Sequence, residues 1–144
     1  MGHDNAQEVI SEWVNWAETD IWNAETLLAA ECNPRHRRNE SVAWHSQQAA
    51  EKILKAYLIK NGDYEVRRFS HNLLALRTEC AGTHDATFRN PELIKQCAYL
   101  NTFSNAKYPD FNQDITTEEA KHALDNAKKI FDFVHEKIKN GNEH

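Results

Sequence analysis

Asp20 is an acidic residue in the middle of an otherwise apolar helix face, between Trp16 and Ala24. An unpaired carboxylate is costly to bury, so Asp20 must have hydrogen-bond partners or line a wet cavity. Under the first alternative it is a structural acid bonded to a tyrosine, serine or lysine of the core. Under the second it belongs to a ligand site. In either case an antiparallel neighbouring helix would place Asp20 near Ala49 and Ala50, whose small side chains leave room.

His45 and Lys52 are the next candidates for chemistry. His45 lies on the flank of an apolar helix face, where a histidine is either a boundary residue with satisfied hydrogen bonds or a group for proton transfer. Lys52 and Lys55 fall on the solvent side of the same helix. A lysine there can still bind phosphate as a point charge.

The stretch "RRFSH" combines two guanidinium groups with the start of a helix. Arg67 and Arg68 precede His71, which falls in the first turn. Free N–H groups point outward at a helix start, so an anion site is a reasonable function for this stretch. The alternative is ordinary exposed loop charge. The sequence has no local pattern of a Ser/His/Asp triad, a glycine-rich phosphate loop or an HExxH metal site.

Composition limits the class of protein. The 144 residues carry a net charge of −5, which does not favour a general nucleic-acid binder but leaves room for a local basic patch. The three cysteines are far apart and odd in number, so neither a disulfide framework nor a metal site is expected. No apolar run approaches the roughly 20 residues of a membrane span. The start of the chain lacks a signal-peptide pattern, so we expect a cytoplasmic protein.

Apolar residues recur at helical spacing along the whole chain. Helices are expected over residues 6–31, from a cap at Asn39 or Ser41 to residue 60, over 70–82, over 91–106 and from 117 to about 138. In the first helix the apolar face should comprise Val9, Trp13, Trp16, Ala17, Ala24, Leu27 and Leu28. Asn90 and the capping box of Thr116 and Glu119 mark two helix starts. The sequence therefore predicts one all-α domain over residues 1–144, an up-and-down bundle of four long helices plus one shorter helix.

In such a bundle the first and third connectors share one end, and the second and fourth connectors share the other. The first end should gather Arg35, Arg37, Arg38 and His84. The opposite end should gather Arg67, Arg68, His71, Lys107 and Tyr108.

Four bulky apolar residues are expected to point away from the core. Trp44 and Ile59 lie on the outer side of the second helix with Gln48 between them, and Trp22 and Phe133 point outward from other helices. Several such groups on one small domain favour a buried patch. The predicted homodimer face therefore consists of Trp22, Trp44, Gln48, Ile59 and Phe133.

Three stretches together resemble the HEPN family (higher eukaryotes and prokaryotes nucleotide-binding domain). They are "WAETDIWNAETLL", "SVAWHSQQAAEKILKAYLIKNG" followed by "SHNLLAL", and "LNTFSNAKYPDF" before "TTEEAKHALDNAKKIF". The resemblance implies a four- to five-helix bundle, frequently dimeric. It also implies a minimal nucleotidyltransferase as partner in a toxin–antitoxin-like pair. Asp20, His45, Lys52 and His71 align with polar positions of this branch.

Some members of the family are metal-independent ribonucleases whose signature is an arginine, four to six residues and a histidine. Two pairs match here, Arg38 with His45 and Arg77 with His84. With seven arginines and eight histidines in 144 residues, about one match is expected by chance. The family's nuclease motif lies near the later helices, where this chain has Lys107 and no histidine.

The leading hypothesis is therefore a non-catalytic, dimeric module that binds a nucleotide or RNA and pairs with a nucleotidyltransferase, without metal or cofactor. Its ligand-binding candidates are Asp20, His45, Lys52, Arg67, Arg68, His71, Lys107 and Tyr108. The alternative is a metal-independent ribonuclease toxin that uses Arg38 and His45, or Arg77 and His84. A third hypothesis is an assembly module with no small-molecule ligand.

Overall fold

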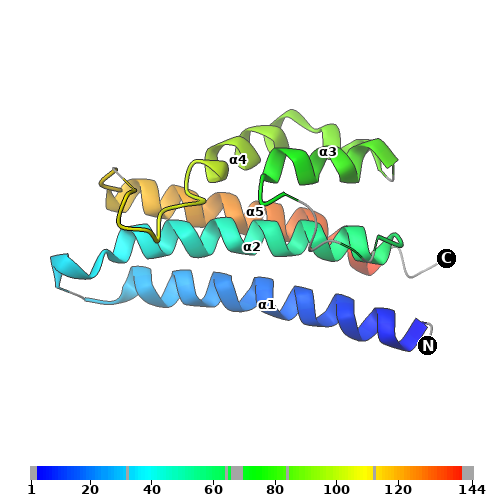
Figure 1. The fold of residues 1–144 in the computed structure, drawn as a ribbon, viewed down its shortest axis with the longest axis horizontal. Helices are drawn as coiled ribbons and strands as arrows, with labels where there is room; N and C mark the ends of the chain where they lie inside the picture. Colours follow the sequence, from blue (N-terminus) through cyan, green and yellow to red (C-terminus); the bar gives the residue numbers. More distant parts are fainter. Residues whose placement is uncertain are drawn as a thin grey trace.

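The computed structural model describes residues 3–31, 33–63, 65, 70–83, 85–111 and 113–140. Within these residues the chain forms three long and two short α-helices and no strand (Figure 1). They are α1 (His3–Ala29), α2 (Arg38–Lys60), α3 (Leu73–Thr83), α4 (Pro91–Asn101) and α5 (Thr117–Asn140), with 3-10 helices η1 (Pro34–His36) and η3 (Ala86–Arg89). The predicted all-α bundle is confirmed. The fourth helix ends at Asn101 rather than near residue 106, so two helices are short instead of one.

Two of the predicted helix starts are confirmed by their capping bonds. The side chain of Asn90 accepts a hydrogen bond from the backbone N–H of Glu92 at 2.8 Å. At the start of α5, Thr116 Oγ1 accepts from the N–H of Glu119 at 3.1 Å, and the Glu119 carboxylate accepts from the N–H of Thr116 at 3.0 Å. This reciprocal pair is the capping box that the sequence predicts.

The start of α2 differs from the prediction. Its N-cap is Arg37, whose backbone is left-handed with φ 50°, and no side chain caps the helix. Asn39 lies inside the first turn and donates instead to the carbonyl of Ile115 at 3.0 Å. A left-handed backbone is uncommon for a residue other than glycine, and here long-range contacts of the α2 N-terminus hold it.

The central helix of the bundle is α2, which contacts α1, α3, α4 and α5. Its residues are therefore buried on several sides, including the side expected to face solvent. Ile59 is 2% exposed and belongs to the core, so the prediction that it is exposed is wrong. Lys55 is 3% exposed and likewise not on a solvent side. A helical wheel assumes one apolar face, and it fails for a helix that has neighbours all around.

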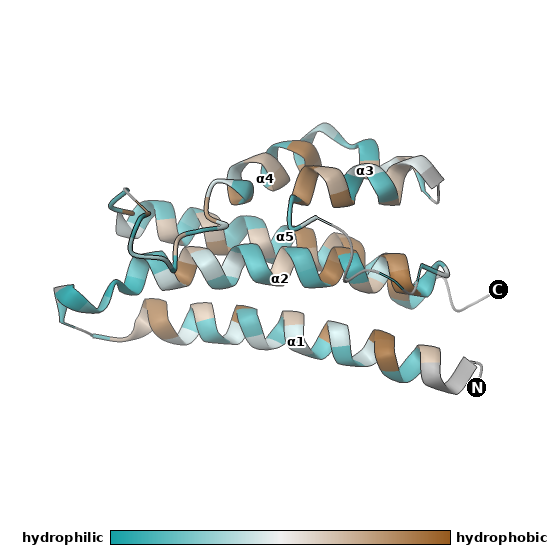
Figure 2. Ribbon diagram, viewed as in Figure 1, coloured by the Kyte–Doolittle hydropathy of each residue, from teal (hydrophilic) through white to brown (hydrophobic). Residues whose placement is uncertain are grey.

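α1 covers one side of the bundle and packs mainly on α2, with a smaller contact to α5 (Figure 1). Figure 2 shows hydrophobic residues recurring along it, separated by hydrophilic ones. Its buried residues are Ile10, Val14, Ala17, Asp20 and Ala24. Val9 and Trp16 are 42% and 57% exposed, so the predicted face is wrong at these two positions. Among the described helices, none is long and apolar enough to cross a membrane.

The predicted arrangement of the connectors is wrong. The fourth connector lies beside the first, because Arg37 pairs with Asp114 at 3.3 Å. The third connector lies at the other end of the bundle, because Asp85 pairs with Lys137 near the end of α5 at 2.9 Å. The cause is the short α3, which starts beside the middle of α2 and runs in the same direction as α2 (Figure 1). α4 then returns, and the residues after it carry the chain back to the start of α2.

Candidate functional site

The buried carboxylate of Asp20 is bound by two side chains of α2. Oδ1 of Asp20 lies 2.8 Å from Nδ1 of His45, and Oδ2 accepts a hydrogen bond from the ammonium group of Lys52. The Asp20 side chain is 6% exposed, whereas those of His45 and Lys52 are 21% and 22% exposed. Asp20 is buried beside a cation and a histidine, so it has the hydrogen-bond partners that a buried carboxylate needs. We call Asp20, His45 and Lys52 the Asp20 cluster.

A second buried carboxylate lies next to this cluster on α2. Glu51 accepts a hydrogen bond from Lys55 at 2.9 Å, and its Oε2 also lies 2.8 Å from Nδ1 of His71. Gln47 donates to the backbone carbonyl of His71 at 3.3 Å, which fixes the chain before α3 against α2. His71 is thereby brought to the same part of α2 as the Asp20 cluster.

Glu51 is not among the residues that the sequence predicts for this candidate site. The signal present in the sequence is the spacing of Glu51 and Lys55, because residues four apart on a helix face each other. That spacing is equally typical of a solvated helix surface, where such pairs contribute little. Only the packing of the chain around His71 against α2 shows that the pair is buried.

An aromatic contact links the Asp20 cluster to the turn after α4. The rings of Trp44 and His45 meet edge to face with their centres 5.0 Å apart. The ammonium group of Lys107 lies 4.4 Å from the centre of the Trp44 ring and 5.2 Å from that of Tyr108. Lys107 is therefore connected to the Asp20 cluster through Trp44. Lys107 and Tyr108 line a hollow together with Arg37 and do not lie at the opposite end of the bundle.

A cleft of about 310 Å³ opens beside Lys52, between α1 and α2. It is lined by Glu12, Trp13, Trp16 and Lys52. Trp16 is 57% exposed, so its ring is available to a ligand. Lys52 lines the cleft and also bonds Asp20, so it connects the Asp20 cluster to the cleft, although Asp20 and His45 are not among the lining residues.

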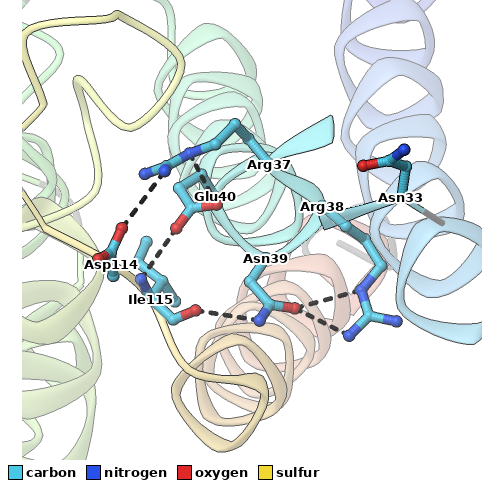
Figure 3. Close-up of a pocket in the computed structure, with 7 residues that line it drawn as sticks. All are labelled: Asn33, Arg37, Arg38, Asn39, Glu40, Asp114 and Ile115. Atoms are coloured by element: carbon cyan, nitrogen blue, oxygen red, sulfur yellow. Dashed lines mark hydrogen bonds and ion pairs between the residues drawn. The ribbon is translucent and has the colours of Figure 1, made fainter. Parts of the chain in front are cut away.

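The N-terminal end of α2 holds a separate polar cavity of about 350 Å³ (Figure 3). Its charged groups pair with one another: Arg37 contacts Glu40 and Asp114, and the Glu40 carboxylate accepts from the N–H of Ile115 at 2.9 Å (Figure 3). Arg38 donates to the carbonyl of Ala30 at 3.0 Å and also to Asn39 and Thr117. These contacts fasten the first connector to the segment before α5.

Of the two arginine–histidine pairs, only Arg38 and His45 both lie within the described residues, and they do not form a common centre. The guanidinium of Arg38 is used in the contacts at the helix start, while His45 is bonded to Asp20. Arg77 donates to the carbonyl of Phe88 at 2.9 Å. His84 lies outside the described residues, as do Arg67 and Arg68.

The Asp20 cluster can offer a ligand an oriented histidine ring and a positive charge. A carboxylate accepts the Nδ1 proton of His45, so the other ring nitrogen is the one that can face a ligand. Lys52 supplies a positive charge and Trp16 a flat apolar surface. Across the residues that the structure describes, no group of three histidine, cysteine or acidic side chains could hold a metal ion.

The comparison with protein families agrees with these features. The HEPN domain family matches residues 10–138, which is most of the chain and overlaps all five described α-helices. Neither the curated proteins nor the solved structures yield a match. The matched range contains the Asp20 cluster, Glu51, His71 and the turn at Lys107. The chain therefore belongs to the HEPN domain family.

Proposed function

We propose that this HEPN domain is a non-catalytic module that binds a nucleotide or an RNA end in the cleft between α1 and α2. The family supports a nucleotide- or RNA-related module in general. The observation that carries the proposal is the position of Lys52, which bonds the buried Asp20 and also lines a cleft with two tryptophans.

The cleft has the two components that a nucleotide needs. An aromatic ring can stack on a base, and such stacking contributes about 1–3 kcal/mol per base. The ammonium group of Lys52 can contact a phosphate as a point charge. Asp20 fixes Lys52 and His45 before a ligand arrives, which lowers the entropic cost of binding. The net charge of −5 works against long-range attraction of RNA, so a short ligand fits this site better than a long duplex.

Binding can be measured by calorimetry with AMP, ATP and a short single-stranded RNA. We expect Lys52→Gln and Trp16→Ala each to raise Kd by about tenfold, since each removes one charge contact or one stacking surface. Lys129→Gln is the matched control, because Lys129 is an exposed lysine of α5 away from the cleft. Unchanged affinity in Lys52→Gln would contradict the placement of the site. Lack of binding to all three ligands would favour an assembly module.

The alternative function is a metal-independent ribonuclease, and one observation favours it. His45 is oriented by a buried carboxylate, an arrangement that general acid–base catalysis uses. Against it stands Arg38, whose guanidinium donates to Ala30, Asn39 and Thr117 rather than facing His45. We therefore propose a binding role for His45.

The ribonuclease alternative predicts RNA cleavage in the presence of EDTA that is lost in His45→Ala. A second variant, His84→Ala, tests the pair of Arg77 and His84. RNA that stays intact during long incubation with the wild-type protein would support the non-catalytic proposal. Cleavage that disappears in either variant would refute it.

The proposal also includes a homodimer and a minimal nucleotidyltransferase as partner. HEPN domains often dimerise. Ile59 is buried, Phe133 packs edge to face on Phe88, and Lys107 covers the ring of Trp44. The dimer is therefore proposed to use a surface other than the α2 strip from Trp44 to Ile59. Light scattering over a concentration series tests the dimer. The neighbouring reading frame tests the partner, because a frame that encodes no nucleotidyltransferase would contradict this part of the proposal.

A further inference from the structure

α1 carries the net negative charge of the whole protein. It contains Asp4, Glu8, Glu12, Glu18, Asp20 and Glu25, and neither lysine nor arginine. Of the 22 acidic residues of the chain, the remaining 16 are outnumbered by 17 basic residues. The net charge is thus −6 on α1 and +1 on everything else. α1 is therefore strongly acidic, although the net charge of the whole chain is only moderately negative.

The acidic side chains of α1 are not all neutralised within the bundle. Asp20 is buried and bonded to Lys52, and Glu25 pairs with Lys128 at 2.6 Å. Glu8 and Glu18 are exposed, and no ion pair of either is found among the described residues. Among the described elements, no helix covers the side of α1 that faces away from α2 (Figure 1). Its outer surface therefore keeps an unbalanced negative charge.

Trp22 adds an apolar anchor to this acidic surface. It is 63% exposed, the largest fraction among the exposed large hydrophobic residues that the structure describes. Beside it lies a hollow of about 310 Å³ between α1 and α5, here called the Trp22 hollow. It is lined by Glu18, Ile21, Trp22, Glu25, Lys128, Phe131 and Asp132. The hollow thus has an apolar lining and three carboxylates against one ammonium group.

Such a lining matches an arginine or lysine side chain of another protein. The aliphatic stem of either residue packs on apolar surface while its charged head stays near carboxylates. A guanidinium or ammonium group also interacts favourably with the face of a tryptophan. Tryptophan is enriched among the residues that dominate binding energy at protein interfaces.

We propose that the outer surface of α1, centred on the Trp22 hollow, docks a protein with a basic surface that inserts an arginine or lysine beside Trp22. A second copy of this chain is a poor occupant, because a two-fold interface would place the same acidic surface against itself. RNA is repelled by the same charge. The Trp22 hollow is separate from the cleft at Lys52, so this inference and the proposed ligand site can fail independently.

The defined probe is a labelled amphipathic peptide of lysine and leucine, about 18 residues or five helical turns long, with fluorescence anisotropy as the readout. The test variant is Glu18→Gln/Asp132→Asn, which removes two charges from the hollow. The matched control is Glu118→Gln/Asp125→Asn, which removes two exposed acidic charges elsewhere on α5. We expect the test variant and Trp22→Ala each to raise Kd by about tenfold, and the control to change it less than about twofold.

Equal weakening in the test and control variants would mean that only net charge matters, and the proposal would fail. Unchanged affinity in Trp22→Ala would exclude the hollow as the anchor. Light scattering of the Trp22→Ala protein provides a further check. If the wild-type protein is a dimer and this variant is a monomer, the surface is a contact between copies and the basic partner is refuted.

Discussion

At the scale of single residues, Asp20 connects α1 to α2 through hydrogen bonds of its buried carboxylate. Its carboxylate is nearly inaccessible to water and receives hydrogen bonds from two α2 side chains. A buried acid of this kind holds the candidate site in place, because it orients both a histidine and a lysine. Removing the charge leaves Lys52 without its carboxylate partner in a half-buried position.

Asp20→Asn is expected to lower the free energy of unfolding by about 1–3 kcal/mol, because a group bonded to the lost charge becomes unsatisfied. Chemical denaturation at neutral pH measures the change. Asp125→Asn is the control, since Asp125 is exposed on α5 and its replacement should alter stability by less than about 0.5 kcal/mol. An equal free energy of unfolding in the two variants would show that the Asp20 carboxylate does not stabilise the packing of α1 on α2.

Cys80 and Cys97 are expected to be inert thiols. Both are buried, and burial raises the pKa of Cys97 to about 12 and that of Cys80 further still. The thiolate is the reactive form, so alkylation of the native protein near pH 8 should be slow. In a Cys32→Ser background, mass spectrometry should find both thiols unmodified in native buffer and fully alkylated in denaturant. Rapid native alkylation of either would mean that α3 and α4 open readily.

At the scale of elements, the joint between η3 and α5 depends on Asp85. Its side chain caps η3 by accepting from the N–H of Thr87 at 2.9 Å, and it pairs with Lys137. Burial alone would raise the pKa of Asp85, but the hydrogen bonds from Thr87 and Lys137 outweigh burial and hold the pKa below its ordinary value of 3.8. The ionised form is therefore favoured by folding.

The sign of the resulting pH dependence follows from the lowered pKa. Between the folded and unfolded pKa values the unfolded chain binds more protons, so this stabilisation is complete above the ordinary pKa and is lost as pH falls through the folded one. We expect Asp85→Asn to cost about 0.5–1 kcal/mol at pH 7, because asparagine can keep the cap but loses the ion pair with Lys137. The difference from wild type should shrink below about pH 4. Denaturant titrations at both pH values measure it, and a constant difference would contradict this role.

At the scale of the whole molecule, Phe88 joins the third connector to the central helix and to the last one. It is fully buried, with its ring 4.6 Å from that of Tyr57 on α2 and 5.4 Å from that of Phe133 on α5. These contacts attach the short α3–α4 pair to the three long helices. They add to the direct contacts of α3 with α2 and of α4 with α2 and α5.

Phe88→Ala is expected to lower the free energy of unfolding by about 3–5 kcal/mol, because it removes a large buried side chain and leaves a cavity. The change should be visible as a lower Tm and as faster hydrogen exchange in α3 and α4. Phe88→Leu, which retains most of the apolar volume, should cost less. Similar losses in both variants would show that ring contacts with Tyr57 and Phe133 matter more than volume.

Local sequence patterns sufficed to predict the helices and to identify Asp20 as a residue that needs partners. Helical spacing, the Asn90 cap and the capping box of Thr116 depend on neighbours within four residues, so local patterns suffice to predict them. Asp20 was also predictable, because an acid within an apolar face must find partners wherever the face packs. The net charge of α1 is likewise a property of sequence alone.

The tertiary structure decided which faces are buried and which connectors meet. Ile59 and Lys55 are buried because α2 has several neighbours, a fact that no single helix encodes. Glu51 belongs to the candidate site because His71, which lies 20 residues further along the chain, packs against its carboxylate. Arg37 and Asp114 are adjacent because α3 and α4 are too short to span the bundle, which returns the fourth connector to the first. All of these features depend on contacts between residues far apart in the sequence, so the spacing of neighbouring residues cannot predict them.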